Sequence, residues 1–186
     1  MGMVALPQKW HTPSDVRLFP DDGNRYECIA GALLVTPAPK ARHQAVCAEL
    51  YEALRAVRAI PGFRMLWSPA DIALREDALV QPDLFVFRTT GGPIEEWSDI
   101  RSLELAIEVL SPSTARYDRL VKRRFYQDVG VPESGIVDAD ARLVERWHPA
   151  DERPEICAAT IAWTPAGAES PIIIDLPAFF TAALDP

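Results

Sequence analysis

An almost continuously apolar segment, Leu103–Leu110 (LELAIEVL), constrains the fold of this chain more than any other feature. A strand that faces solvent on one side alternates apolar and polar residues, whereas a strand buried on both faces is apolar nearly throughout. The segment therefore predicts a central strand that other elements cover on both sides. Glu108 stands inside this segment, between Ile107 and Val109.

Helical patterns lie on both sides of this strand in the sequence. Val46, Leu50, Leu54 and Val57 form one apolar stripe, which predicts a helix over His43–Ala59. Further helices are predicted before and after it: a short one capped by Thr12, one from Ser113 or Thr114 to about Val129, and a closing one over Leu176–Phe180.

The predicted strands are short and separated by turn residues. Tyr26–Ile29 and Ala32–Thr36 flank Ala30-Gly31, which is typical of a β-hairpin with a two-residue turn. Ala78–Phe87 is predicted as one strand, with Pro82 near its middle. Further strands are expected within Phe63–Leu74, Gly135–Val137, Leu143–Trp147, Ile156–Trp163 and Ile172–Ile174. This order predicts an α+β (α/β) fold with a mixed sheet, in a single domain over residues 1–186.

Composition favours a globular protein of the cytoplasm. Cys28, Cys47 and Cys157 are an odd number and form no CxxC pair, so disulfides and a zinc cluster are not expected. No apolar run approaches the ~20 residues that cross a bilayer. Residues 1–10 lack the basic and apolar regions of a signal peptide. We therefore expect a cytoplasmic protein without a membrane partner.

The net charge of −8 counts against general binding of nucleic acid, which needs clustered cations. Arg116, Arg119 and Arg123 are nevertheless spaced i, i+3 and i+7 on a predicted helix, where they share a face that could follow a phosphate backbone. The alternative is a solvated surface. A metal-dependent enzyme can also carry surplus acid at its site, because the cation neutralises it locally.

Two carboxylates interrupt apolar strand segments and are candidate metal ligands. Asp83 follows Val80-Gln81-Pro82, and Glu108 lies within the predicted central strand. An ionised carboxylate in apolar surroundings is costly unless it is paired or bound to a metal. Mg²⁺ suits such a pair, because it uses few carboxylates and takes oxygens of water and phosphate as further ligands. The alternative is that each acid lies at a strand end and meets solvent or an arginine.

Several short motifs follow one another between Arg25 and Trp147. They are Tyr26-Glu27, Pro37-Ala38-Pro39 with His43-Gln44, Val80–Leu84 (VQPDL), Glu108–Thr114 (EVLSPST), the set Asp118, Lys122 and Tyr126, Gly130–Glu133 and Ile136–Asp138. In this order and spacing they resemble the Uma-type restriction endonucleases, a branch of the PD-(D/E)XK nuclease superfamily. The resemblance implies a restriction-endonuclease-like mixed sheet flanked by helices, and Mg²⁺-dependent hydrolysis of DNA, with Mn²⁺ as a substitute. A homodimer is expected by analogy with nucleases that cut both strands.

The resemblance also implies roles for the matching residues. Asp83 and Glu108 match the metal-binding acids, and Val109 would add its backbone carbonyl. Glu27 matches an acid that completes the metal site or positions water. The metal would activate a water and stabilise charge on the phosphate. Gln81, in the motif of Asp83, is expected to support the site.

The departure from the family pattern that matters most is at Leu110, which stands at the second position after Glu108, where the superfamily has a lysine. Smaller departures are at Ala30 and Ala32 and at Ser134-Gly135, and neither removes a proposed ligand. Lys122 is the candidate replacement, and its spacing puts it on one helix face with Asp118 and Tyr126, which would support the site. The alternative is a solvated pair of Asp118 and Lys122.

His43 and the missing lysine leave two further alternatives open. His43 begins the first long helix, where it either lies near the site or only caps the helix. The absence of the lysine and the net acidity favour a second hypothesis for the whole chain, a catalytically inactive protein of the same fold that binds nucleic acid or acts as an assembly module.

Overall fold

The computed structural model describes residues 9–89 and 92–185. The N-terminal segment on which the targeting prediction rests lies mostly outside these residues. The elements follow in the order α1 (Pro13–Val16), β1 (Asn24–Ile29), β2 (Ala32–Pro37), α2 (Ala41–Leu54), η1 (Arg55–Ala59), β3 (Phe63–Trp67), β4 (Ile72–Arg75), β5 (Ala78–Val80), β6 (Leu84–Arg88), η2 (Trp97–Asp99), β7 (Leu105–Val109), α3 (Ala115–Tyr117), η3 (Asp118–Lys122), α4 (Arg123–Asp128), β8 (Glu133–Asp138), β9 (Leu143–Trp147), β10 (Glu155–Cys157), β11 (Thr160–Trp163), β12 (Ile172–Asp175) and α5 (Leu176–Leu184).

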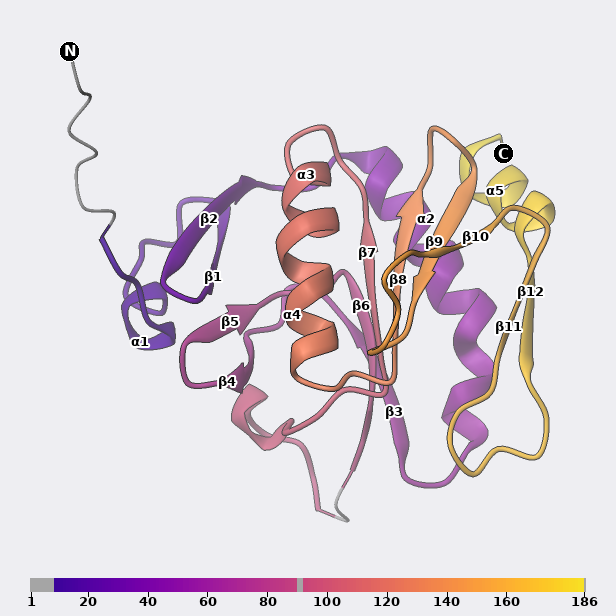
Figure 1. The fold of residues 1–186 in the computed structure, drawn as a ribbon, viewed down its shortest axis with the longest axis horizontal. Coiled ribbons are helices and arrows are strands. Elements are labelled where there is room, and N and C mark those ends of the chain that lie inside the picture. Colours follow the sequence, from indigo (N-terminus) through magenta and orange to yellow (C-terminus); the bar gives the residue numbers. More distant parts are fainter. Residues whose placement is uncertain (1–8, 90–91, 186) are drawn as a thin grey trace.

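A mixed sheet of order β10-β9-β8-β7-β6-β3 forms the centre of the molecule. Strands β7 and β8 are parallel, and the other neighbours pair antiparallel. All five residues of β7 are buried, which confirms the predicted central strand. Helix α2 lies behind this sheet and the α3–α4 helix lies in front of it (Figure 1).

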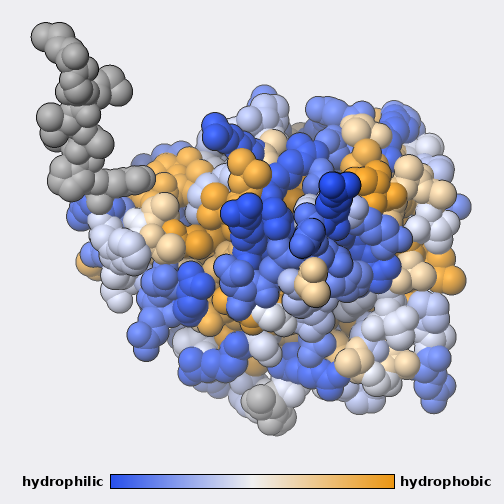
Figure 2. Space-filling model, in the orientation of Figure 1, coloured by the Kyte–Doolittle hydropathy of each residue, from blue (hydrophilic) through white to orange (hydrophobic). Residues whose placement is uncertain are grey.

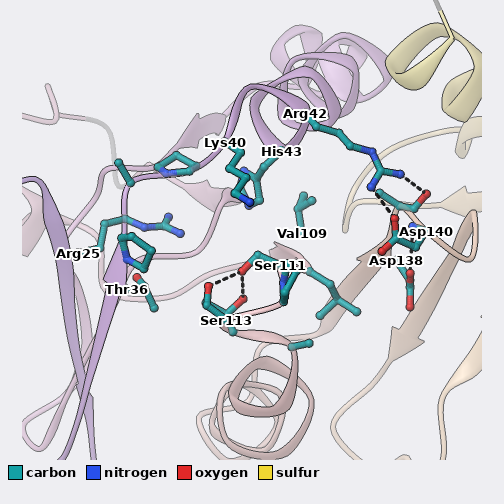
Figure 3. Close-up of a pocket in the computed structure, with 18 of the residues that line it drawn as sticks. Arg25, Thr36, Lys40, Arg42, His43, Val109, Ser111, Ser113, Asp138 and Asp140 are labelled. Carbon is teal, nitrogen blue, oxygen red and sulfur yellow. Dashed lines mark hydrogen bonds and ion pairs between the residues drawn. The ribbon is translucent and has the colours of Figure 1, made fainter.

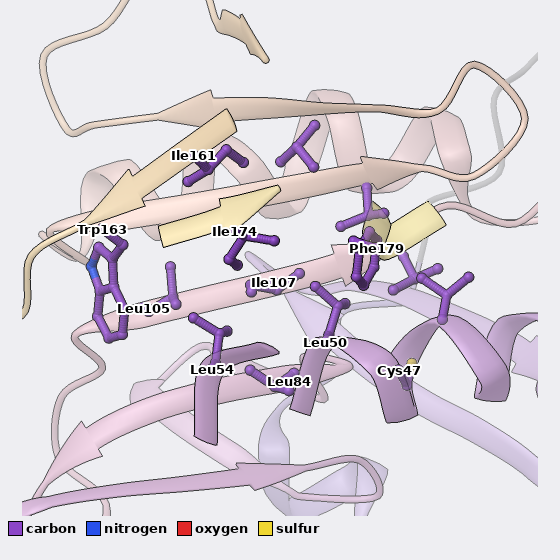
Figure 4. Packing of buried hydrophobic residues seen from close by; sticks show 14 of the residues in the cluster. Cys47, Leu50, Leu54, Leu84, Leu105, Ile107, Ile161, Trp163, Ile174 and Phe179 are labelled. Carbon is purple, nitrogen blue, oxygen red and sulfur yellow. The ribbon is translucent and has the colours of Figure 1, made fainter. Parts of the chain in front are cut away.

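The two faces of β7 belong to two different hydrophobic clusters. Leu105 and Ile107 pack in a cluster with residues of α2 and α5, seen at close range in Figure 4. Ala106 belongs to the other cluster, which contains Phe125 and Tyr126 of α4. Because successive side chains of a strand point to opposite faces, Glu108 shares the face of Ala106 and is directed toward α4.

A smaller sheet of order β2-β1-β5-β4 corrects the prediction of one strand over Ala78–Phe87. Strand β5 pairs with β1 in this sheet, whereas β6 pairs with β7 and β3 in the central sheet. Pro82 has no N–H group and cannot continue a ladder of hydrogen bonds. The residues Gln81-Pro82-Asp83 therefore lead from one sheet to the other, and Asp83 lies at the junction.

Most other predicted elements are confirmed, with shifted ends. In the β1–β2 hairpin, Ala30 (φ 49°) and Gly31 (φ 78°) both have positive φ, as a two-residue type I′ turn requires. The predicted strand Ile156–Trp163 is instead two strands, β10 and β11, in different sheets. None of the helices in the described residues is long and apolar enough to cross a membrane.

The helix after Thr114 differs from a regular α-helix in two ways. The side chain of Thr114 makes no capping hydrogen bond, and its Oγ1 lies 3.0 Å from Oγ of Ser111. The turn η3, Asp118–Lys122, is π-helical, and the N–H of Arg123 donates to the carbonyl of Asp118. Such wide turns are rare in α-helices, and those that do occur are often found at functional sites.

Candidate active site

Asp83 and Glu108 occupy facing positions where β6 begins and β7 ends. Leu84 pairs with Ile107 in the antiparallel ladder, so Asp83 lies opposite Glu108 in the next position. The N–H of Val109 donates to Oδ2 of Asp83 at 2.9 Å. Both acids are buried. Two adjacent antiparallel strands, β6 and β7, thus each bring one carboxylate to the same place.

Lys122 joins Glu108 to the neighbouring sheet. Its Nζ lies 2.9 Å from Oε1 of Glu108 and 2.9 Å from Oε1 of Glu27, which is on β1. The lysine side chain is only 3% exposed, so the alternative of a solvated pair with Asp118 is wrong. Lys122 is therefore a buried cation between two carboxylates.

Two further bonds fix these carboxylates. The hydroxyl of Tyr126 donates to Oε1 of Glu108 at 2.5 Å. The backbone N–H of Gln81 donates to Oε1 of Glu27 at 2.7 Å, and the amide of the Gln81 side chain donates to Asp71. Gln81 thus supports the site through its backbone, at the crossing between the sheets.

Asp83 is held by a second set of residues. Oδ1 accepts a hydrogen bond from Nη1 of Arg25 at 3.0 Å, and Oδ2 lies 3.1 Å from Nε2 of His43. His43 therefore contacts a site residue from the first turn of α2. Sequence reasoning missed Arg25, although a signal was present: it precedes Glu27 by two residues on β1, and such residues share a face.

Burial and opposite charges shape the protonation of this cluster. Burial disfavours the charged form of Lys122, but the carboxylates of Glu108 and Glu27 outweigh it and hold the lysine pKa well above its ordinary value. Burial raises the pKa of Glu108, against the opposing charge of Lys122. Burial likewise raises the pKa of Asp118 to about 6. Lys122 is thus a permanent cation among acids that are costly to ionise.

Asp83 gives a testable contribution to stability at acid pH. Burial would raise its pKa, but the hydrogen bond and charge of His43 and the charge of Arg25 outweigh it and lower the pKa to about 2, from 3.8. A lowered folded-state pKa gives stability that is present above about pH 4 and is lost as the pH falls toward about pH 2. The loss for this group is about 2 kcal/mol.

We expect the difference in unfolding free energy between wild type and Asp83→Asn to shrink by about 2 kcal/mol as the pH falls from about 4 to about 2. Urea unfolding at several pH values measures it. The exposed Asp21, changed to asparagine, is the matched control for the same substitution at the surface. A difference that stays constant with pH would contradict the stabilising role of Arg25 and His43.

Asp83, Glu108 and the backbone carbonyl of Val109 are the groups of this site that could hold a metal ion. Among the described residues there is no group of three or more His, Cys, Asp or Glu side chains arranged to hold a metal ion. Mg²⁺ needs only one or two carboxylates, with water and phosphate oxygens as its other ligands. Asp83, Glu108 and the backbone carbonyl of Val109 match this requirement, although Lys122 and Arg25 pair with the two acids in this structure.

Two cavities open beside Asp83. The larger, about 850 Å³, is lined on one side by Arg25, Lys40 and His43 and on the other by Ser111 and Ser113. Figure 3 shows the side chains of Lys40 and His43 directed into it from the start of α2. The smaller, about 190 Å³, includes Asp83 in its wall and shares Arg25 and His43 with the first. The site is thus reached from solvent on the side of Asp83.

The three predicted DNA-contacting arginines differ in their surroundings. Arg116 is exposed. Arg119 pairs with Asp138 and Glu145 and lies at the larger cavity. The guanidinium of Arg123 lies 4.3 Å from the ring centre of Trp147. The face over α4 is mostly hydrophilic (Figure 2). Their contact with nucleic acid stays a prediction.

Comparison with known proteins agrees with this fold. A crystal structure from Anabaena variabilis, titled a "putative nuclease belonging to DUF820", aligns with a TM-score of 0.74 at 21% sequence identity. The alignment covers 94% of this chain and 99% of that one. At this identity the likeness shows a common fold, the one predicted from the sequence. No curated protein matches the chain.

The family comparison covers most of the chain. The model of the Uma2 family, described as "Putative restriction endonuclease", matches residues 13–169. The match contains Glu27, Asp83, Glu108 and Lys122. The chain therefore belongs to the Uma2 family of restriction-endonuclease-like proteins.

Proposed function

We propose that this chain is a magnesium-dependent endonuclease that hydrolyses phosphodiester bonds in DNA. The observation that carries the proposal is the meeting of Asp83, Glu108 and Lys122 at the junction of two sheets, beside cavities open to solvent. Membership in the Uma2 family supports the reaction class. A divalent ion, held by Asp83, Glu108 and the carbonyl of Val109, would supply Lewis-acid activation of water and neutralise charge on the phosphate.

The other residues of the site orient these groups. Nζ of Lys122 lies 2.9 Å from Oε1 of Glu108 and carries a positive charge. Lys122 would take the role of the superfamily lysine, whose position Leu110 occupies here, and stabilise charge developing on the phosphate. Tyr126 and Gln81 hold Glu108 and Glu27 in place. Arg25 and His43 hold Asp83 and also line the larger cavity, where they would meet the substrate.

Cleavage of a supercoiled plasmid tests the proposal directly. Purified protein with Mg²⁺ or Mn²⁺ is expected to nick or linearise the plasmid, and EDTA is expected to stop it. Asp83→Asn and Glu108→Gln keep the shape of each side chain but remove its charge, and we expect each to lower the rate by about a hundredfold or more. Gel electrophoresis over time gives the rates.

Two exposed acids serve as controls for these changes. Asp21→Asn and Glu152→Gln make the same chemical substitutions on the surface and are expected to cleave as the wild type does. Equal nicking by wild type and by both site variants would end the nuclease proposal, because the cleavage would then come from a contaminant or from another site.

A second candidate function is a nuclease fold without catalysis that binds nucleic acid or acts as an assembly module. One observation favours it: Lys122 and Arg25 already neutralise Glu108 and Asp83 within the chain, so the cluster does not need a metal to be folded. Calorimetry separates the two functions. Mn²⁺ binding that is lost in both Asp83→Asn and Glu108→Gln favours the nuclease, and metal-independent binding of DNA without cleavage favours the module.

We also propose that the chain acts as a homodimer, because cutting both strands of a duplex commonly uses two active sites. Light scattering after size-exclusion chromatography tests it. A monomer at the concentrations that cleave DNA would remove this part of the proposal.

A further inference from the structure

Trp67 is an exposed aromatic residue next to the candidate active site. It ends the edge strand β3, pairs with Leu84 in the ladder and remains 51% exposed. The following residue, Ser68, donates its N–H to the carbonyl of Asp83 at 3.1 Å and accepts a hydrogen bond from Arg25. The indole is therefore tied through the backbone to the residue that carries the proposed chemistry.

The ring of Trp67 is supported from one side. The ring of Tyr51 on α2 meets it edge to face, with centres 4.9 Å apart and an angle of 77°. His43, Cys47 and Tyr51 are spaced i, i+4 and i+8, so they form one stripe of α2. His43 and Cys47 line the smaller cavity, and Tyr51 supports the indole at its wall. An exposed indole with a fixed orientation loses little freedom when a flat partner stacks on it.

The smaller cavity has the size and lining for one flat ring. Its volume is about 190 Å³, below the roughly 300–1,000 Å³ of pockets for drug-sized ligands. Trp67, Pro39, Pro69 and Cys47 give it apolar walls, and Asp83 lies at the same cavity. The cavity shares Arg25, Pro39 and His43 with the larger one, into which Lys40 and His43 point (Figure 3).

We infer that the site takes an unpaired stretch of DNA, either a single strand or a locally opened part of a duplex such as a supercoiled plasmid, with one unpaired base stacked on Trp67 in the smaller cavity and the adjoining phosphates beside Arg25 and Lys40 in the larger one. A base within a duplex is already stacked on its neighbours and cannot enter a cavity walled by an indole and two prolines without leaving the helix, which costs stacking and pairing free energy. Aromatic stacking with cations along the backbone is the usual way to bind single strands. This inference rests on the proposed function, because it names the form of DNA that the same site accepts.

Binding without metal tests the inference separately from cleavage. Fluorescence anisotropy, with EDTA present, compares a short fluorescein-labelled oligothymidine with a duplex of the same length. We expect wild type to bind the single strand more tightly than the duplex. Trp67→Ala should weaken single-strand binding about tenfold and leave duplex binding unchanged. Trp67→Phe keeps an aromatic face and should retain most of the affinity.

Trp97→Ala is the matched control, because Trp97 is also exposed, at 36%, and lines neither cavity. Thermal unfolding of each variant shows whether it is folded, and Trp67→Phe keeps the test decisive if Trp67→Ala is not. Equal single-strand affinity of wild type and the folded Trp67 variants, or tighter binding of the duplex, would overturn the inference. The two proposals can fail separately. Loss of plasmid cleavage in the Asp83 and Glu108 variants would support the nuclease whatever the Trp67 variants do. A protein that does not cleave DNA could still lose single-strand affinity when Trp67 is changed.

Discussion

Lys122→Met is expected to lower the free energy of unfolding by about 3–5 kcal/mol. The side chain of Lys122 is 3% exposed and its Nζ contacts both Glu27 and Glu108. Methionine fills a similar volume but leaves two buried carboxylates without their cation, and burial already raises the pKa of Glu108 well above its ordinary value. Removing one partner of a buried pair exposes the full cost of desolvating the other. Urea denaturation at neutral pH measures the change.

Two comparisons separate this effect from the loss of a lysine as such. Lys9→Met removes an exposed lysine and should change the unfolding free energy by less than about 0.5 kcal/mol. The double variant Lys122→Met with Glu108→Gln should recover part of the loss, because it removes one of the uncompensated charges. Equal stabilities of wild type and Lys122→Met would mean that the carboxylates are solvated, contrary to the structure.

Leu84→Ala is expected to lower the free energy of unfolding by about 2–5 kcal/mol. Leu84 is fully buried between β3 and β7 and belongs to the cluster that includes Leu50 and Leu54 of α2 (Figure 4). A central strand held on both edges cannot collapse easily into the space left by the lost side chain, so we expect a value in the upper part of this range. Thermal and urea unfolding measure the change.

Leu120→Ala makes the same substitution at a residue that is 49% exposed on the π-helical turn. Little apolar area returns to water there, so its effect should stay below about 1 kcal/mol. Similar losses for the two variants would contradict the position of Leu84 in the core beside the candidate site.

The periodicity of the sequence predicted most elements but not their membership in sheets. The almost continuously apolar segment Leu103–Leu110 identified the central strand, because burial on both faces leaves a direct mark on composition. Ala78–Phe87 is also mostly apolar and was predicted as one strand, whereas the structure has two strands there, β5 and β6, in different sheets. Apolar character reports burial, whereas the partner of a strand depends on contacts that are distant in the chain.

The sequence likewise predicted some features of the candidate site and not others. The motifs around Asp83 and Glu108 and the spacing of Lys122 and Tyr126 indicated residues that the structure brings together. Arg25 was missed because an arginine on a strand is usually read as solvated, and its partner Asp83 lies far away in the sequence. The cavity beside Trp67 was also invisible, since it arises where a helix, an edge strand and a loop meet.

The π-helical turn at Asp118–Lys122 makes the winding of this helix a determinant of the site. An α-helix advances about 100° per residue, and a π turn takes up one more residue than an α turn. If the same residues wound as a regular α-helix, everything beyond the turn would therefore rotate through roughly that angle relative to the residues before it. Lys122 and Tyr126 would then no longer both face Glu108, although no residue of the site had been exchanged. The phase of one helix thus sets whether cation and carboxylate meet.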